Sequence, residues 1–356
     1  MDHKEILRWL REDDPQALGE LWARADKVRQ ENVGDQVHLR GLIEIGNYCV
    51  RRCAYCGLNA GRKDIPRYRM TKTEILACAA EAVEYKYGSV VIQAGEDPFW
   101  TLEFIASLIG EIKASTPLAI TLSLGERSDE ELVAWRAAGA DRYLLRFETS
   151  NRELFDHIHP PLANLHSDRL AMLRRMAEMG YEIGSGVMVG IPGQTYDDLA
   201  RDVAMFARLN LDMIGLGPYI SHPDTPLGVE KPAEHDQVPA SEELTYRMLA
   251  LARLACPSAN IPSTSALATL NLAQGRELGL VRGANIVMPN LTPQQYRPMY
   301  EIYPAKACIR ETAQQCRSCM KRRIESLGRT VGDGAGASPN YIARHAQESG
   351  DATCVH

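Results

Sequence analysis

Eight short apolar or β-branched runs alternate with segments of helical periodicity, and this alternation most narrows the folds open to the chain. Strands joined by helices predict a parallel sheet, because each crossover returns the chain to the same edge. Eight such units over about 250 residues match a complete (β/α)8 TIM-type barrel of the α/β class. A doubly wound open sheet is the alternative, since periodicity does not show that a sheet closes. The runs are VHLRGLIEIG, SVVIQAG, LAITLSLG, RYLLRFE, EIGSGVMVG, MIGLGPYI, IPSTSAL and NIVMPN.

The helical patterns and the two ends of the chain define its expected organisation. Helices are predicted within residues 3–31, 71–88, 128–140, 166–180 and 195–210, several of them opened by Ser or Thr with acidic residues in the first turn. We expect an N-terminal helical extension (1–34), a barrel (35–305) and a C-terminal extension (306–356). The final stretch, GRTVGDGAGASPNYIARHAQESGDATCVH, is rich in small and polar residues. It predicts a peripheral or partly disordered tail.

Charge and composition exclude several classes of partner. The formal net charge is -6, which gives no electrostatic reason to bind nucleic acid or an anionic membrane surface. The N-terminus lacks the apolar core of a signal peptide, and no segment has the length of a membrane span. We therefore expect a cytoplasmic protein. In that compartment the nine cysteines are expected as metal ligands or reactive thiols, not as a disulfide framework.

Three of these cysteines, Cys49, Cys53 and Cys56, follow the first strand-like run within eight residues. In a parallel barrel this position is the C-terminal end of a strand, where functional loops gather. The loop is short enough to wrap three thiolates around one metal centre. Structural zinc prefers four ligands, so a zinc site would need a distant fourth one. A 4Fe-4S cluster accepts three thiolates and leaves one iron open.

This spacing, with the aromatic Tyr55 before the third cysteine, resembles the signature of the radical S-adenosylmethionine (SAM) enzymes. In that superfamily SAM binds the open iron, and the reduced cluster cleaves SAM to a 5′-deoxyadenosyl radical. The resemblance implies a 4Fe-4S cluster and SAM as cofactors, and an external electron donor. The cofactors would carry the difficult chemistry, while the protein binds, orients and excludes water.

Three further segments match SAM-binding motifs of that superfamily. QAGED (93–97) resembles the Gly-Glu motif that receives the SAM amino group, although an ordinary acidic turn is the alternative. In RFE (146–148) two charges lie on one face of a strand and are expected to point into the barrel mouth, with a surface ion pair as the alternative. Arg169 is expected to contact the SAM carboxylate, with a solvated arginine as the alternative. Met288 is expected in the wall beside SAM, with a core methionine as the alternative. The expected SAM contacts are Tyr55, Gln93, Gly95, Glu96, Arg146, Glu148, Arg169 and Met288.

Six segments in order then narrow the resemblance to the HydE family, the radical SAM maturases of FeFe-hydrogenase. They are GLIEIGNYCVRRCAYCGL, GADRYLLRFETSNRELFDHIHP, VMVGIPGQTYDDL, GLGPYISHPDTPL, IPSTSAL and GANIVMPNLTPQQYR. The resemblance implies a complete barrel with a large internal cavity and a role in assembling the organometallic diiron subcluster of the hydrogenase. The substrate would be small, organometallic or derived from an amino acid: a cysteine-bound iron carbonyl cyanide precursor delivered by HydG. HydG and HydF, the other maturases, would be partners.

Such a substrate needs a closed cavity with a few fixed donors. Hydroxyl groups in IPSTSAL suit contacts to an anion, although a helix cap is an equal alternative. Thr121 matches a cavity position of the family, and the tyrosines of YRPMYEIYP are candidates for the cavity floor, with helix packing as the alternative. The expected substrate contacts are Thr121, Ser263, Thr264, Ser265, Tyr296, Tyr300 and Tyr303.

A second cysteine group, Cys308, Cys316 and Cys319, follows the barrel segment. Its position and spacing resemble an accessory Fe–S site (2Fe-2S or 4Fe-4S) of part of the HydE family, and we expect it to be dispensable for SAM cleavage. Zinc is the alternative occupant, with Cys354 or His356 as a fourth ligand. Cys78 and Cys256 lie in helical contexts and are expected to be buried small hydrophobic residues.

Three other functions compete with the maturase. Biotin synthase carries a second cluster on cysteines of its barrel strands, and LAITLSLG, RYLLRFE and GVMVG contain none. Methylornithine synthase, a carbon-skeleton mutase, resembles the chain more broadly but lacks the C-terminal cysteine group. A non-catalytic Fe–S carrier would have no use for an enclosed SAM site. The two histidines His157 and His159 are expected to be structural.

Overall fold

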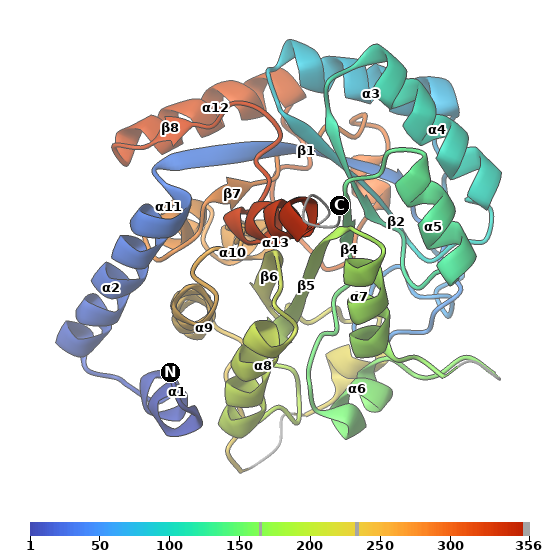
Figure 1. Cartoon of the computed structure of the whole chain (residues 1–356). Helices are drawn as coiled ribbons and strands as arrows, with labels where there is room; N and C mark the ends of the chain where they lie inside the picture. Colours follow the sequence, from blue (N-terminus) through green and yellow to red (C-terminus); the bar gives the residue numbers. More distant parts are fainter. Residues whose placement is uncertain (164–165, 232–234, 352–356) are drawn as a thin grey trace.

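The computed structural model describes residues 1–163, 166–231 and 235–351. The chain begins with α1 (His3–Leu10) and α2 (Pro15–Val33), whose N-termini are capped by the carboxylates of Asp2 and Asp14. Helix α1 packs against the outer helices α8 (Tyr196–Arg208) and α9 (Glu242–Ala255), and α2 packs against α9. They lie at the periphery of the molecule in Figure 1. The predicted N-terminal helical region is confirmed as two helices.

Parallel strands surround the centre of the molecule, with helices outside them (Figure 1). They pair in the order β6-β5-β4-β3-β2-β1-β7, and a short strand, β8, pairs with the start of β1. Along each strand alternate side chains point into the lumen, which places functional side chains at regular intervals around it. The strands are β1 (Gln36–Gly46), β2 (Ser89–Ala94), β3 (Ala119–Ser123), β4 (Arg142–Leu144), β5 (Glu182–Val189), β6 (Met213–Pro218), β7 (Ile286–Val287) and β8 (Thr330–Val331).

Helices form where the sequence predicts them. Reciprocal capping boxes open α3 (Thr71 with Glu74) and α5 (Ser128 with Glu131), because each hydroxyl and carboxylate satisfies a free backbone N–H. The remaining helices are α3 (Lys72–Glu84), α4 (Leu102–Ser115), α5 (Asp129–Ala137), α6 (Arg152–Ile158), α7 (Arg169–Glu178), α10 (Ser265–Leu270), α11 (Gly275–Leu280), α12 (Ala313–Ser326) and α13 (Pro339–Asp351), with 3-10 turns η1 (Pro226–Val229) and η2 (Arg297–Met299). None of the helices in the described ranges is both long and apolar enough to cross a membrane.

Seven of the eight predicted runs contain a regular strand, and IPSTSAL does not. Its segment makes only isolated parallel bridges, from Asn260 to Met213 of β6 and from Pro262 to Ile286 of β7. Pro262 has no N–H for a ladder, and Thr264 is already the N-cap of α10. The regular strands of the described residues therefore form a partial barrel, and the expectation of a complete one is corrected in this respect.

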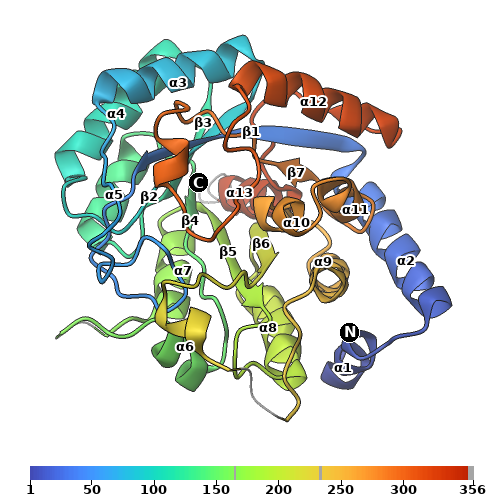
Figure 2. The same cartoon turned by 180° about the vertical axis from the view of Figure 1, so that it is seen from behind.

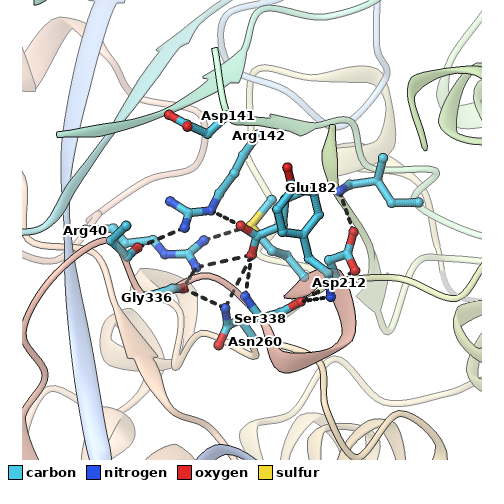
Figure 3. A network of polar contacts seen from close by, with 12 residues as sticks. Arg40, Asp141, Arg142, Glu182, Asp212, Asn260, Gly336 and Ser338 are labelled. Carbon is cyan, nitrogen blue, oxygen red and sulfur yellow. Dashed lines mark hydrogen bonds and ion pairs between the residues drawn. The ribbon is translucent and has the colours of Figure 1, made fainter. Parts of the chain in front are cut away.

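The C-terminal stretch is not the peripheral tail that its composition predicts. It passes across the N-terminal ends of the barrel strands, and α13 lies in the middle of the ring of helices in both views (Figures 1 and 2). The Gly336 carbonyl accepts hydrogen bonds from Arg40 (3.0 Å) and Asn260 (2.9 Å), and the Ser338 N–H donates to Glu182 (2.9 Å), as Figure 3 shows. Residues 352–356 lie outside the described part.

Small residues make this close packing possible. A Cβ atom at Gly88 would lie 1.5 Å from the carbonyl oxygen of Gly334. Any side chain at position 88 would therefore clash with the C-terminal segment. The composition that predicted disorder thus reflects close approach of two backbone segments. Buried arginines also hold the C-terminal segment against the barrel, since Arg142 donates to the Ala335 carbonyl (2.8 Å) as well as to Glu182.

Candidate active site

The loop that carries Cys49, Cys53 and Cys56 follows β1 and is fixed by three separate parts of the barrel. Val50 N–H donates to the Glu96 carbonyl (2.9 Å), Ala54 N–H to Ile158 (2.8 Å) and Gly57 N–H to Ile302 (3.0 Å). A Cβ atom at Gly57 would lie 2.3 Å from the Glu301 carbonyl oxygen. Only glycine allows this approach, so the end of the loop is held in one position.

The three thiols are partly buried and close in sequence. Burial raises the pKa of Cys56 to about 12, and burial followed by the charge of Cys56 raises the pKa of Cys53 well above its usual value. Thiolates here would need a cation to stabilise them. Within the described ranges no three His, Cys, Asp or Glu side chains are arranged to hold a single metal ion. Three thiolates are one fewer than the four ligands that structural zinc prefers, and they suit a 4Fe-4S cluster, in which each thiolate binds a different iron.

The QAGED segment lies directly against this loop. A Cβ atom at Gly95 would be 2.2 Å from the Tyr48 carbonyl oxygen and 2.8 Å from Cys49 Cβ. Glu96 accepts from Arg51 Nε (2.7 Å), and the buried Asp97 accepts from Arg69 (2.7 and 3.1 Å). The side chains of Glu96 and Asp97 are thus bound to arginines of the protein. The backbone of Gly95 packs directly against Cys49.

The RFE segment brings its two charges to the same cavity. Arg146 Nη2 lies 3.1 Å from Glu148 Oε2, and Glu148 Oε1 accepts from the Tyr55 hydroxyl (3.3 Å). Glu148 is buried and has a φ of 61°, a left-handed conformation that is uncommon outside glycine. Such a carboxylate is held by its surroundings and is not a surface ion pair.

Arg169 begins α7 and lines the cavity, but its guanidinium is bound within the protein. It donates to Glu126 (2.9 Å) and to the Arg146 carbonyl (2.6 Å). Glu126 also accepts from Ser167 (2.6 Å) and lies 3.0 Å from Arg51. The sequence reasoning missed Glu126, although its place directly after the third strand-like run is where a barrel presents functional residues.

His159 belongs to this buried network, while His157 lies on the surface beside Glu230 (3.0 Å). Burial, followed by the charge of Arg169, lowers the pKa of His159 to about 3. The imidazole is therefore neutral near pH 7 and acts as a hydrogen-bond partner of Arg169.

One cavity of about 350 Å³ runs from the cysteine loop into the lumen. Eleven of the predicted site residues line it together with Cys56: Tyr55, Gln93, Thr121, Arg146, Glu148, Arg169, Thr264, Ser265, Met288, Tyr300 and Tyr303. Two predicted substrate contacts face elsewhere. Ser263 donates to the Arg276 carbonyl (3.0 Å), and Tyr296 stacks on Tyr68 with ring centroids 4.5 Å apart.

Several polar atoms in the cavity wall lack a hydrogen-bond partner among the described residues. They include the buried hydroxyls of Thr121 and Thr264, and Glu148 Oε2 has no hydrogen bond beyond its ion pair. The Ser265 and Tyr303 hydroxyls bond each other (3.0 Å), and Gln93 donates to the Tyr300 hydroxyl (3.2 Å). Buried polar atoms are normally paired, so the two threonine hydroxyls indicate positions where a ligand completes the hydrogen bonding.

The sequence reasoning also missed a buried ion pair between Glu44 and Lys306 in the same wall. Asn290 donates to the same carboxylate (3.0 Å). Glu44 gave a signal, because it is the one charged residue within the apolar GLIEIG. Its partner lies 262 positions later, beyond the reach of any local pattern.

The second cysteine group lies around α12. Arg276 donates to Cys308 Sγ through both terminal nitrogens (3.4 Å), and Arg323 Nε lies 3.3 Å from Cys319 Sγ. Cationic neighbours stabilise thiolates. Cys316 lies within α12, and Cys354 and His356 are outside the described residues. Burial raises the pKa of Cys78 and Cys256 to about 12, which is typical of unreactive thiols.

Comparison with known proteins decides the family. The profile of the Radical SAM superfamily matches residues 43–206, which include the cysteine loop and the motifs through β5. The [FeFe] hydrogenase maturase subunit HydE of Thermotoga maritima is 44% identical over 312 residues, which cover 88% of this chain and 86% of that protein. The chain belongs to the HydE family of radical SAM enzymes. That family implies a 4Fe-4S cluster and SAM.

More distant relatives share the fold with this HydE-family chain. The 3-methylornithine synthase of Methanosarcina acetivorans is 27% identical and covers 77% of this chain and 75% of that protein. The crystal structure of methylornithine synthase (PylB) superposes with a TM-score of 0.80 at 23% identity, over 97% of this chain and 96% of that one. The likeness to this crystal structure shows a common fold and no more.

Proposed function

We propose that this HydE-family enzyme cleaves SAM reductively and uses the resulting radical to assemble the organometallic diiron subcluster of FeFe-hydrogenase. Its substrate is a small cysteine-bound iron carbonyl cyanide precursor, supplied by HydG. The observation that carries the proposal is the cavity lined by Cys56 together with Thr121 and Thr264, whose hydroxyls have no hydrogen-bond partner among the described residues. The 44% identity to a HydE of known role supports it.

Cys49, Cys53 and Cys56 would hold the 4Fe-4S cluster. When bound, the cluster supplies the electron that breaks a C–S bond of SAM. The chain's own work is to bind and orient. The backbone of Gly95, packed against Cys49, would receive the SAM amino group, and Glu148, with one oxygen free of hydrogen bonds, would accept from SAM hydroxyls. The further SAM contacts would be Tyr55, Gln93, Glu96, Arg146, Arg169 and Met288.

The part of the cavity beside Thr121 and Thr264 would take the substrate. Thr121 and Thr264 offer buried hydroxyls without protein partners in the described structure, and Ser265 with Tyr303 offers a third contact. Apolar walls, including Leu42, keep bulk water out, which protects a primary carbon radical. Residues 260–262, which form isolated bridges to β6 and β7, would take the place of the remaining strand and close the barrel around this volume. Tyr300 lines the same volume, whereas Ser263 and Tyr296 would act by packing.

A second Fe–S cluster, 2Fe-2S or 4Fe-4S, would be held by Cys308, Cys316 and Cys319. The arginines beside Cys308 and Cys319 favour thiolate ligands there. None of these cysteines lines the cavity that Cys56 lines, so SAM cleavage is expected to survive the double change Cys316→Ala and Cys319→Ala. Loss of cleavage in that variant would contradict the assignment.

The substrate is tested by comparing ligands in the anaerobic, reconstituted enzyme. A synthetic cysteine-bound iron carbonyl cyanide should be consumed together with SAM, whereas consumption of an iron-free amino acid instead would indicate a carbon-skeleton mutase. Thr121→Val removes a hydroxyl that has no protein partner among the described residues, so folding should be little changed. Consumption of the iron compound should fall about ten-fold, while the exposed control Thr330→Val keeps the wild-type rate. Equal rates in both variants would contradict the assigned contact.

A further inference from the structure

An exposed group of apolar and cationic side chains lies beside the cysteine loop. Tyr48, Val50 and Phe99 have exposed fractions of 37%, 38% and 50%, and they are three of the eleven large hydrophobic residues exposed in the described ranges. Arg69 joins them, since its guanidinium lies 3.9 Å from the ring centroid of Tyr48 and 4.4 Å from that of Phe99. We call these four residues the aromatic patch. Clustered exposed apolar groups with an arginine are typical of interaction sites.

The patch adjoins the first cysteine through its own backbone. Tyr48 and Val50 flank Cys49 in sequence. Val50 N–H donates to the Glu96 carbonyl (2.9 Å), which fixes the loop against the segment that leads to Phe99. Asp97 holds Arg69 in place through two hydrogen bonds. The patch is therefore an ordered, exposed surface next to the cysteine loop, and none of its four residues lines the cavity that Cys56 lines.

The segment around the patch is locally basic in a chain of net charge -6. Residues 48–69 contain six arginines and lysines and one aspartate. Arg51, Arg62 and Arg69 are ion-paired with nearby carboxylates, and the exposed Arg52 and Lys63 carry the remaining positive charge at the surface. Such a local excess of positive charge steers an acidic partner toward this face.

We propose that the aromatic patch is the docking surface for an acidic one-electron carrier protein with an exposed planar cofactor. The inference rests on the proposed function, which needs one electron from outside for each SAM cleaved, and the cavity side of the loop is reserved for SAM and substrate. The carrier loses one electron and the cysteine-bound cluster gains it, before SAM receives it. Flat aromatic side chains beside Cys49 give the carrier's cofactor a close approach.

The test compares a protein donor with a small one. A photoreduced flavodoxin and dithionite each drive 5′-deoxyadenosine formation in wild type, Phe99→Ser and Arg52→Glu. We expect the flavodoxin-driven rate to fall about ten-fold in each variant, because docking is lost, while the dithionite-driven rate stays at the wild-type value. The exposed controls Val133→Ser on α5 and Arg174→Glu on α7 should match wild type with both donors. Wild-type rates with flavodoxin in both patch variants would overturn the proposal.

Binding gives a readout that does not depend on SAM chemistry. Oxidised flavodoxin should bind wild type, more weakly as salt rises, and about ten-fold more weakly to Arg52→Glu. If wild type cleaves no SAM even with dithionite, the proposed function fails, whereas weaker flavodoxin binding by the patch variants still supports docking. If Phe99→Ser instead converts an oligomer to a monomer in sedimentation and leaves flavodoxin binding unchanged, the patch is a contact between two copies and the proposal is wrong.

Discussion

The two ends of the lumen differ in how their polar groups are satisfied. At the floor, formed by the starts of the strands, Glu182 binds Arg142 and the Ser338 N–H (Figure 3). Asp212 accepts a hydrogen bond from Arg344 (2.6 Å). Toward the mouth, Cys56 lines the cavity together with Thr121 and Thr264, whose hydroxyls have no hydrogen-bond partner among the described residues. The carboxylates of the floor are thus paired by the chain's own arginines and C-terminal segment, whereas the two threonine hydroxyls are left for a ligand to pair.

Replacing Arg344 by alanine should give the largest change in stability, because it removes the cation paired with Asp212 at the floor. Burial raises the pKa of Asp212, and Arg344 works against that shift. Without the arginine a buried carboxylate loses its cation, and we expect the free energy of unfolding to fall by about 2–3 kcal/mol, measured by urea titration. Arg322→Ala, at an exposed site of α12, is the matched control. Equal stability of the two variants would show that the C-terminal segment does not hold the floor.

Filling the space between the two ends should impair turnover without unfolding the protein. Gly215 of β6 lines the cavity, and a Cβ atom there would meet only Ser185 O, at 3.8 Å. We expect Gly215→Leu to fold normally and to lower substrate consumption about ten-fold by occupying the cavity. Circular dichroism and substrate consumption check this, with Gly110→Ala of α4, which has open space around it, as control. A fully active Gly215→Leu enzyme would place the substrate elsewhere.

The smallest expected effect is a pH dependence of stability near the mouth. Asp202 of α8 is buried and accepts from the Ser150 N–H (2.6 Å) in the loop after β4. Burial raises its pKa to about 7 from 3.8. A raised pKa means that the folded protein binds the proton more tightly, so this contribution is present below about pH 4 and is lost as pH rises to about 7. Asp202→Asn should therefore be about 1 kcal/mol more stable than wild type at pH 8 and not at pH 4. A constant difference across thermal melts at both pH values would contradict this.

Sequence reasoning reached the mouth because its chemistry is local. The cysteine loop, QAGED and RFE each follow closely on the C-terminal end of a strand, where a parallel barrel gathers its functional residues. It failed where geometry depends on distant segments. The orientation of Tyr296 is set by stacking on Tyr68, and the Glu44–Lys306 pair joins residues 262 positions apart in the chain. The floor was missed because glycines that permit close packing, such as Gly334, have the same composition as a disordered tail.

The central claim is that the mouth of this barrel performs radical SAM chemistry at Cys49, Cys53 and Cys56. The most direct measurement is 5′-deoxyadenosine formed by anaerobically reconstituted wild type and Cys53→Ala, each reduced with dithionite in the presence of SAM. The account predicts product from the wild type and none from the variant. No product from a wild-type protein whose cluster is fully assembled would contradict the account and would identify the chain as an Fe–S carrier.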